Sequence, residues 1–246
     1  MKIKILTLFP KMVEIPLGES VIKRAVDKGA VEFSIFNIRD SATDKHSTVD
    51  DTPYGGGGGM VMMPEPLCRS LEQAVNGSGQ TRIILTSAAG KKFDQKMAQE
   101  LSQEESLIFI CGHYTGVDER VKEFFPIEEV SIGDYVLTGG DLPALVMIDA
   151  IVRLIPGVLG NFESAEYDSF QNVILGYPQY TKPQEFNGKK VPEVLVSGHH
   201  AQVARWRRLK ALEQTYRNRP DLLERINLTD EEKKFLHSLT ENNNRG

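Results

Sequence analysis

Apolar positions in the first two-thirds of the chain form short strand-like runs separated by segments with helical spacing. The runs predict strands at Lys2–Phe9, Val31–Ile38, Arg82–Ser87, Leu107–Cys111 and Glu129–Ser131. The segments between them predict helices at Ser20–Lys28, Pro66–Val75, Asp94–Leu101 and Leu142–Leu154. Such alternation is typical of an α/β fold in which helices cover a parallel sheet.

This pattern breaks between Pro156 and Pro192, where Gly, Pro, Asn and Tyr are frequent and neither period is sustained. We interpret Asn161–Lys190 as an interdomain linker. Helices are predicted again at His199–Tyr216 and Thr229–Leu239. The chain is thus divided into an α/β domain over 1–160, a linker over 161–190 and a small all-helical domain over 191–246.

The sequence predicts where two of these helices begin. Asp141 stands before Leu142 and Pro143, so that an acid occupies the expected capping position and a proline the first turn. Thr229 and Glu232 form a capping box at the start of the last helix.

The composition is that of an ordinary globular protein, with 246 residues and a formal net charge of −5. Charge is unevenly distributed, because the segment Arg205–Arg219 holds six basic residues and one acid, Glu213. Its apolar residues Trp206, Leu209, Leu212 and Tyr216 share one arc of the predicted helix, and Arg207, Arg208 and Lys210 fall outside it. The negative total therefore does not exclude RNA.

The chain lacks the features of a secreted or membrane protein. Its first apolar run stops at Pro10 without a cleavage site, and the longest apolar region, Leu142–Leu159, is broken by Asp149, Arg153 and Pro156. Its two cysteines match no metal or redox spacing and suit a reducing cytoplasm. We expect a cytoplasmic protein.

Five consecutive glycines, Gly55–Gly59, follow Asp50-Asp51-Thr52-Pro53-Tyr54. Such a run favours positive φ or close backbone approach. It is either a flexible loop or a loop whose amides meet a phosphate or a base. It matches neither a P-loop nor a dinucleotide fingerprint.

Two further glycine-containing turns follow strands, at residues 112–116 and 133–140. Parallel sheets bind ligands at the carboxyl ends of their strands, where glycine leaves room for an adenosine ring against bare backbone. Either turn alone could be an ordinary strand-to-helix connection. Both in one sheet indicate a nucleotide-like ligand.

Arg153 and Asp168 are ambiguous as single residues. Arg153 ends an apolar helix, where a cation favours the helix dipole, and Asp168 lies in the predicted linker, where most aspartates are solvated or cap a turn. The five histidines do not fall at zinc-ligand spacing.

Taken together, these segments resemble the bacterial tRNA guanine-N1 methyltransferase (TrmD) family over essentially the whole chain. The most specific is the run from Ser131 to Pro143. The others are Leu8-Phe9-Pro10, Asp44-Lys45-His46, Thr48 to Asp51, Tyr54 to Gly57, Ile155 to Gly160, Asp168-Ser169-Phe170 and Ser197 to His200.

The resemblance implies a SPOUT-type parallel sheet with a C-terminal trefoil knot that binds S-adenosylmethionine, and a homodimer with active sites shared between subunits. It implies methylation of N1 of the guanosine immediately 3′ of the anticodon, position 37 of tRNA. The implied cofactor-binding residues are Leu85, Thr86, Ser87, Ala88, Gly112, Tyr114, Gly116, Ile132, Gly133, Asp134, Tyr135, Val136, Leu137, Thr138, Gly139, Gly140 and Pro143.

By the same resemblance Asp168 matches the general base that removes the N1 proton, and Arg153 matches the residue that stabilises charge on O6. The implied substrate-binding residues are Asp50, Gly55, Gly56, Gly57, Ser164, His199, Arg207 and Arg208. Mg²⁺ is a further implied cofactor, for which no ligands are assigned.

Several positions depart from the family pattern. Thr115 stands where a glutamate is usual, His113 where an arginine is usual, and Gly58 where a proline is usual. Leu85-Thr86 and Ala88 replace a more common Tyr-Leu and Pro in one cofactor wall. The missing carboxylate at Thr115 removes one candidate for magnesium binding.

Three alternatives remain from the sequence. One is another knotted RNA methyltransferase with a different base or a ribose hydroxyl as target; a ribose-methylating relative would need neither Asp168 nor the Ser197–His200 segment. Another is a non-catalytic RNA-binding module of the same fold, which would not need both glycine turns and Asp168. The third is a nucleotide-dependent metabolic enzyme, which leaves the basic C-terminal helix unexplained.

Overall fold

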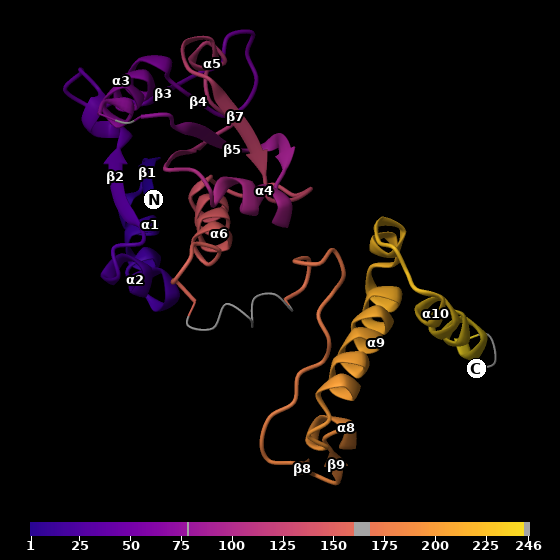
Figure 1. Ribbon diagram of the computed structural model, residues 1–246. Coiled ribbons are helices and arrows are strands. Elements are labelled where there is room, and N and C mark those ends of the chain that lie inside the picture. The colour runs from indigo at the N-terminus through magenta and orange to yellow at the C-terminus, as the bar shows by residue number, and fades with distance from the viewer. Residues whose placement is uncertain (78, 160–167, 244–246) are drawn as a thin grey trace. The chain divides into compact units, whose positions relative to one another are not determined.

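The computed structural model describes residues 1–77, 79–159 and 168–243. The chain divides into two compact units, Met1–Gly160 and Asn161–Gly246 (Figure 1). Among the described residues, no helix combines the length and apolar character that crossing a membrane requires.

A five-stranded sheet in the order β2-β1-β6-β5-β7 forms the centre of the first unit, and all neighbouring strands are parallel. The predicted α/β fold with a parallel sheet is therefore confirmed. Strand β5 extends beyond its predicted end and is irregular between Thr86 and Lys91 where it pairs with β7. The strands are β1 (Lys2–Thr7), β2 (Glu32–Asn37), β5 (Arg82–Lys92), β6 (Ser106–Cys111) and β7 (Ile127–Ser131).

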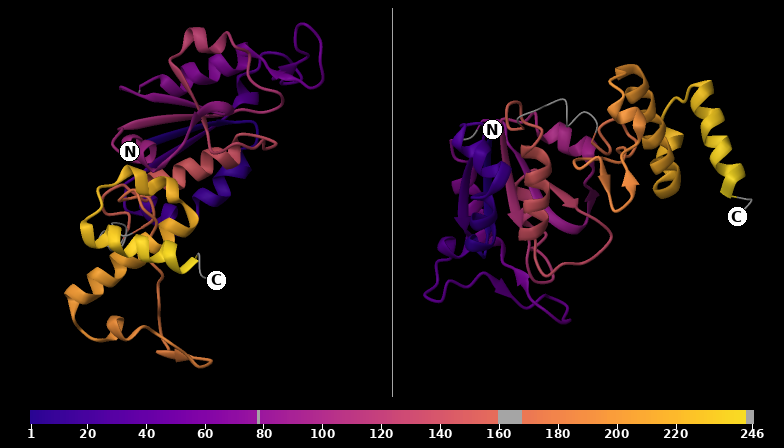
Figure 2. Two further views of the ribbon diagram at one scale, coloured as in Figure 1. Left: turned by 90° about the vertical axis from the view of Figure 1, so that its right-hand side faces the viewer. Right: turned by 90° about the horizontal axis from the view of Figure 1, so that it is seen from below.

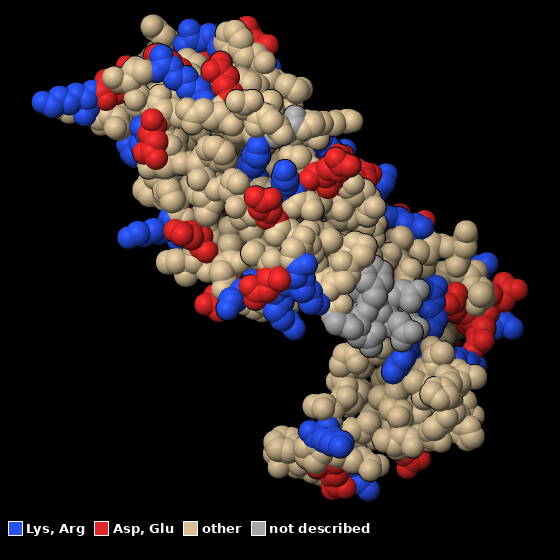
Figure 3. Space-filling view, turned by 60° about the vertical axis from the view of Figure 1, so that its left-hand side comes forward, with Lys and Arg blue, Asp and Glu red and all other residues tan. Residues whose placement is uncertain are grey.

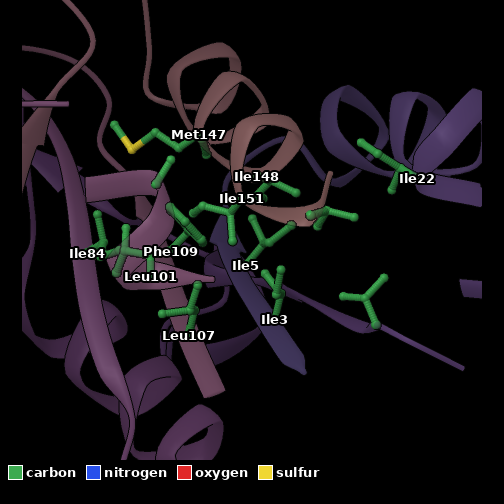
Figure 4. Close-up of a cluster of buried hydrophobic side chains, with 14 of the residues drawn as sticks. Ile3, Ile5, Ile22, Ile84, Leu101, Leu107, Phe109, Met147, Ile148 and Ile151 are labelled. Atoms are coloured by element: carbon green, nitrogen blue, oxygen red, sulfur yellow. The ribbon is translucent and has the colours of Figure 1, made fainter. Parts of the chain in front are cut away.

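Helices cover both faces of this sheet (Figure 2). One face packs on α1 (Pro10–Leu17), α2 (Ser20–Asp27), α4 (Gln95–Leu101) and α6 (Asp141–Val152). The other face packs on α3 (Pro64–Val75), α5 (Val121–Phe124) and the 3-10 helix η1 (Ile38–Ser41). Figure 4 shows side chains of the first core, among them Phe109 of the fully buried β6 and Ile148 of α6.

The start of α6 differs from the prediction. Gly140 is the N-cap, Asp141 is the first helical residue, and the helix has no side-chain cap. The Asp141 carboxylate, in a residue only 1% exposed, accepts a hydrogen bond from the Thr7 hydroxyl instead. The Asp141 side chain therefore does not cap its own helix.

Helices also form at both predicted positions in the second unit. These are α9 (His200–Asn218) and α10 (Asp230–Asn243), with the short elements α8 (Glu193–Val196), η2 (Pro220–Arg225), β8 (Glu185–Phe186) and β9 (Lys189–Lys190). The predicted capping box is confirmed, because Thr229 N donates to Glu232 Oε2 at 2.8 Å and Glu232 N to the Thr229 hydroxyl at 3.3 Å.

Part of the predicted linker belongs to the core of this second unit. Ile174 is 6% exposed and packs with Ala211 and Leu212 of α9. Leu175 N also donates to the Thr215 hydroxyl at 3.0 Å. The described part of the segment from Asp168 onwards is therefore attached to α9, although it lacks long regular elements.

Candidate active site

A cavity of about 420 Å³ is lined by the irregular part of β5, by the loop that follows β6 and by the end of β7 with the loop that follows it. This is the edge at which parallel sheets hold ligands. Its volume lies within the range of pockets that hold small molecules. The lining consists of residues 85–89, 112–117, 129–133 and 135–140, together with Glu119, Lys122 and Pro143.

The structure brings together every residue assigned to cofactor binding from the sequence except Asp134. The Asp134 carboxylate is exposed, and its Oδ2 atom lies 3.6 Å from the Lys92 ammonium. The cavity is also lined by residues that the sequence does not assign to the cofactor, namely Ala89, His113, Thr115, Val117, Glu119, Lys122, Glu129, Val130 and Ser131.

Three glycines of the two turns have a packing role that the sequence does not indicate. A Cβ on Gly140 would lie 1.9 Å from the Thr86 hydroxyl oxygen and 2.6 Å from Gly112 N. A Cβ on Gly139 would lie 2.2 Å from Cε1 of His113, and one on Gly133 2.4 Å from the Tyr135 ring. These glycines therefore let the protein pack on itself, and that packing sets the shape of the cavity walls.

Three charged side chains gather at one side of the cavity. The Lys122 ammonium lies 2.7 Å from Glu119 Oε2 and also forms an ion pair with Glu129. Burial raises the pKa of Glu129, but hydrogen bonds from Lys122 and Ser87 outweigh it and leave that pKa below its usual value. Lys122 comes from α5 and Glu129 from β7, so no local motif marks them in the sequence.

Tyr114 connects the cavity to a residue assigned to substrate binding. Its backbone has a φ of 60°, and its side chain is 43% exposed. Burial and a hydrogen bond to the Asp50 carboxylate raise the pKa of the Tyr114 phenol, against the opposing effect of Arg39. Asp50 therefore lies beside the cavity mouth.

The glycine run Gly55–Gly59 is joined to the same cavity through Thr115. The expected positive φ is confirmed at Gly55, Gly56, Gly57 and Gly59. The Thr115 hydroxyl donates to the carbonyl oxygen of Met60 at 2.5 Å, and Thr115 N donates to the same oxygen at 2.9 Å. The threonine thus fastens the end of the glycine loop to the wall of the cavity.

The two residues with expected catalytic roles lie in different units. Arg153 is half-buried at the C-terminal end of α6, where its backbone N–H donates to the Asp149 carbonyl at 3.2 Å. Asp168 is half-buried in the second unit, and its carbonyl accepts from Gln171 N at 3.3 Å. Ser164, assigned to substrate binding, lies outside the described residues.

The basic segment of the second unit is less positive than its sequence indicates. Arg208 pairs with Glu232 at 2.7 Å, Arg205 pairs with Glu231, and Arg219 pairs with Asp221 at 2.7 Å. These three acids lie outside the segment Arg205–Arg219 and offset half of its six basic charges. Figure 3 shows the same intermingling of basic and acidic side chains on the face that it presents.

The other residues assigned to the substrate in this unit lie on or next to α9. His199 is exposed and precedes the helix, and its N–H donates to the Ser197 hydroxyl at 3.2 Å. The Arg207 guanidinium carbon lies 5.1 Å from the centroid of the Tyr177 ring, a cation–π geometry.

Metal ligands do not gather in the part of the chain that the structure describes. No three His, Cys, Asp or Glu side chains of residues 1–77, 79–159 and 168–243 lie close enough together to hold a metal ion. Cys68 and Cys111 both carry free thiols.

Comparison with known proteins gives a consistent result. Residues 1–225 match the family model described as tRNA (Guanine-1)-methyltransferase TrmD. A protein of Geobacter metallireducens named tRNA (guanine-N(1)-)-methyltransferase is 56% identical over 241 residues, which is 98% of each chain. Proteins with the same name from Brevibacillus brevis and Moorella thermoacetica are each 54% identical, over 97% and 98% of this chain and 98% and 97% of their own.

Proposed function

The chain belongs to the tRNA (guanine-1)-methyltransferase family TrmD, and on this premise we propose that the cavity lined by β5 and by the loops after β6 and β7 binds S-adenosylmethionine. The enzyme methylates N1 of the guanosine at position 37 of tRNA. The observation that carries the proposal is that residues assigned to the cofactor from sequence, on one strand and two loops, converge on one cavity.

The residues present fit such a ligand. The loop over 133–140 exposes Tyr135, Val136 and Leu137, apolar side chains that suit an adenine ring. Ser87, Lys122 and Glu129 supply polar groups at another part of the wall. When bound, S-adenosylmethionine supplies a methyl group made electrophilic by the adjoining sulfonium.

Asp168 and Arg153 are proposed to act on the guanine. N1 of neutral guanine carries a proton, and its lone pair is delocalised into the ring, so that a base must accept the proton before N1 becomes nucleophilic. The Asp168 carboxylate is proposed to accept it. Negative charge then develops on O6, where the Arg153 guanidinium is proposed to donate hydrogen bonds. No step is assigned to Mg²⁺, for which the sequence assigns no ligands.

We propose that the chain also carries the trefoil knot. The supporting observation is the close contact of the loops after β6 and β7, in which Gly140 N donates to the Gly112 carbonyl at 2.7 Å and His113 forms a β-bridge with Gly139. In a knot the chain passes through a loop, so the threaded segment must pack closely against the residues around it.

A homodimer with shared active sites is proposed for a further reason. Helices α1 and α6 are in contact, and they leave Met12, Ile15, Leu142 and Val146 between 42% and 67% exposed. Neighbouring exposed apolar side chains of this kind mark association surfaces. A two-fold dimer would cover the same residues in both subunits and form two equivalent sites.

The second unit is proposed to bind tRNA through residues that include His199, Arg207 and Arg208. Its helices α9 and α10 belong to a separate unit. In this unit, Ile174 of the segment after Asp168 packs against α9. The Arg208 guanidinium donates to the Glu232 carboxylate through Nε. A contact of Arg208 with a tRNA phosphate would therefore use its other N–H groups. Because its substrate is tRNA, we expect the enzyme in the cytoplasm.

The test is to incubate tRNA from a strain lacking this activity with the full chain and methyl-labelled S-adenosylmethionine. The tRNA is then digested, and the methylated nucleosides are mapped by mass spectrometry. We expect label in 1-methylguanosine at position 37. Label in another base or a ribose would support a different knotted methyltransferase, and binding without any label would support the non-catalytic module.

A further inference from the structure

The carboxylate of Asp141 is buried directly behind the wall of the cavity. Asp141 is 1% exposed and follows Gly139 and Gly140, which line the cavity. Its Oδ1 atom accepts from the Thr7 hydroxyl of β1, and its Oδ2 atom lies 2.7 Å from Nε2 of His113. Buried carboxylates are destabilising unless hydrogen-bond donors surround them, and the Cys111 thiol is a third group that hydrogen-bonds to Asp141.

His113 stands between the two loops that form the cavity walls. Its backbone forms an antiparallel bridge with Gly139, and its ring occupies the space into which a Cβ on Gly139 would point. On its other sides the ring lies 4.8 Å from the Phe9 ring and 6.1 Å from the Tyr114 ring, centroid to centroid. The side chain is 13% exposed and lines the cavity.

The chemistry of Asp141 determines which nitrogen of His113 carries hydrogen. Asp141 is the first residue of α6, where the helix dipole favours a carboxylate. An ionised carboxylate only accepts hydrogen bonds, so His113 Nε2 must donate. This holds for the neutral Nε2–H tautomer and for the imidazolium alike.

We propose that His113 is a positioning residue for the methyl-donor site. Its Nε2–H bond to the buried Asp141 carboxylate fastens the loop over 112–116 to the loop over 133–140 and fixes the cavity before the nucleoside methyl donor binds. The proposal rests on the function proposed above and adds a residue that the sequence reading did not assign. His113 is not a catalytic residue in this account, because it acts through the loops.

A pre-formed cavity increases affinity, because less conformational freedom is lost on binding. Loss of the His113 donor should therefore raise the KM for S-adenosylmethionine more than it lowers kcat at saturating donor. His113→Phe keeps a planar ring beside Phe9 and Gly139 but removes the donor. His113→Gln loses the ring but offers an amide N–H at a position similar to Nε2.

The kinetic test uses the full chain with saturating tRNA and varied S-adenosylmethionine. We expect His113→Phe to raise the KM about tenfold or more and His113→Gln to stay within about threefold of wild type, as a hydrogen bond to a charged group predicts. His237→Phe is the matched control, since His237 lies 3.4 Å from Glu241 at an exposed position of α10. Equal KM values for wild type and His113→Phe, or equal losses in His113→Phe and His113→Gln, would overturn the proposal.

A spectroscopic measurement keeps the proposal testable if His113→Phe does not fold. In the ligand-free chain labelled with ¹⁵N-histidine, we expect His113 to show a protonated Nε2 whose proton exchanges slowly, because the partner carboxylate is buried. Asp141→Asn should alter this signal. An unprotonated Nε2 in wild type would overturn the positioning role of His113 and leave the proposed function standing. Failure of wild type to bind S-adenosylmethionine would overturn the proposed function.

Discussion

The backbone N–H of Gly140 donates to the carbonyl oxygen of Gly112 at 2.7 Å. This hydrogen bond joins the loop after β7 to the loop after β6, and the Thr86 hydroxyl of β5 donates to the Ile110 carbonyl beside it at 3.1 Å. Three strands are thus connected at the edge of the sheet where the cavity lies.

Replacement of Gly140 should open this junction. In Gly140→Val the Cβ alone would lie 1.9 Å from the Thr86 hydroxyl oxygen and 2.6 Å from Gly112 N, so the two loops must separate. We expect S-adenosylmethionine binding to fall below detection by calorimetry and the melting temperature to drop. Gly18→Ala is the control, because its Cβ would lie 3.5 Å from the nearest atom, an ordinary contact. Unchanged affinity in Gly140→Val would mean that the donor binds elsewhere.

Asp168→Asn tests the proposed general base. The amide keeps the shape of the side chain without its basicity, and a general base contributes about 10²–10⁴-fold to the rate. We therefore expect single-turnover methyl transfer to fall by that factor, with S-adenosylmethionine affinity close to wild type. Glu185→Gln, at an exposed position of the same unit, should leave the rate unchanged. A fall of less than about tenfold would reduce Asp168 to a positioning role.

The Arg208–Glu232 pair should make the second unit sensitive to acid. Burial raises the pKa of Glu232, but hydrogen bonds from Arg208 and Thr229 N outweigh it, so that the folded-state pKa lies below the usual 4.5. A depressed carboxyl pKa stabilises the folded state above about pH 4.5, and this contribution is lost as the pH falls through the folded-state value.

The measurement is the melting temperature across this pH range. Arg208→Ala and Glu232→Gln should both melt lower than wild type at neutral pH, and the difference between Glu232→Gln and wild type should shrink as the pH falls below about 4.5. A constant difference at every pH would show that the charge of Glu232 does not contribute. If Arg208→Ala binds tRNA less well, comparison with Glu232→Gln shows how much of that loss comes from a less stable second unit.

Mixing two inactive variants tests the shared active site. If each site combines the cavity of one subunit with Asp168 of the other, a heterodimer of Asp168→Asn and Gly140→Val chains has one intact site. Random exchange makes half of the dimers mixed, so activity should recover to about a quarter of wild type. Differently tagged chains confirm the mixing. Verified heterodimers without activity would show that both elements come from one chain.

Much of the first unit could be predicted from sequence, because buried parallel strands give apolar runs that stand out from the helices between them. The sequence predicts no helix at the position of α1, because the first apolar run stops at Pro10. Pro10 is the first residue of the helix, where no intrahelical N–H bond is needed. A proline at the first position of a helix therefore does not interrupt that helix.

The cavity could be outlined from sequence but not explained. The resemblance found the loops, whereas the reason for Gly140 depends on its distance from Thr86, a residue of another strand. Asp141 looked like a helix cap, because local spacing carries no information about Thr7 or His113. The pair of Lys122 and Glu129 forms only when α5 and β7 are packed together.

The measurement that tests the central claim most directly is a crystal structure of the full chain with bound S-adenosylmethionine. We predict electron density for the methyl donor in the cavity lined by residues 85–89, 112–117 and 135–140, with its adenine ring against the last of these loops. Density for the donor at another place on the molecule, with this cavity left empty, would contradict the proposed site.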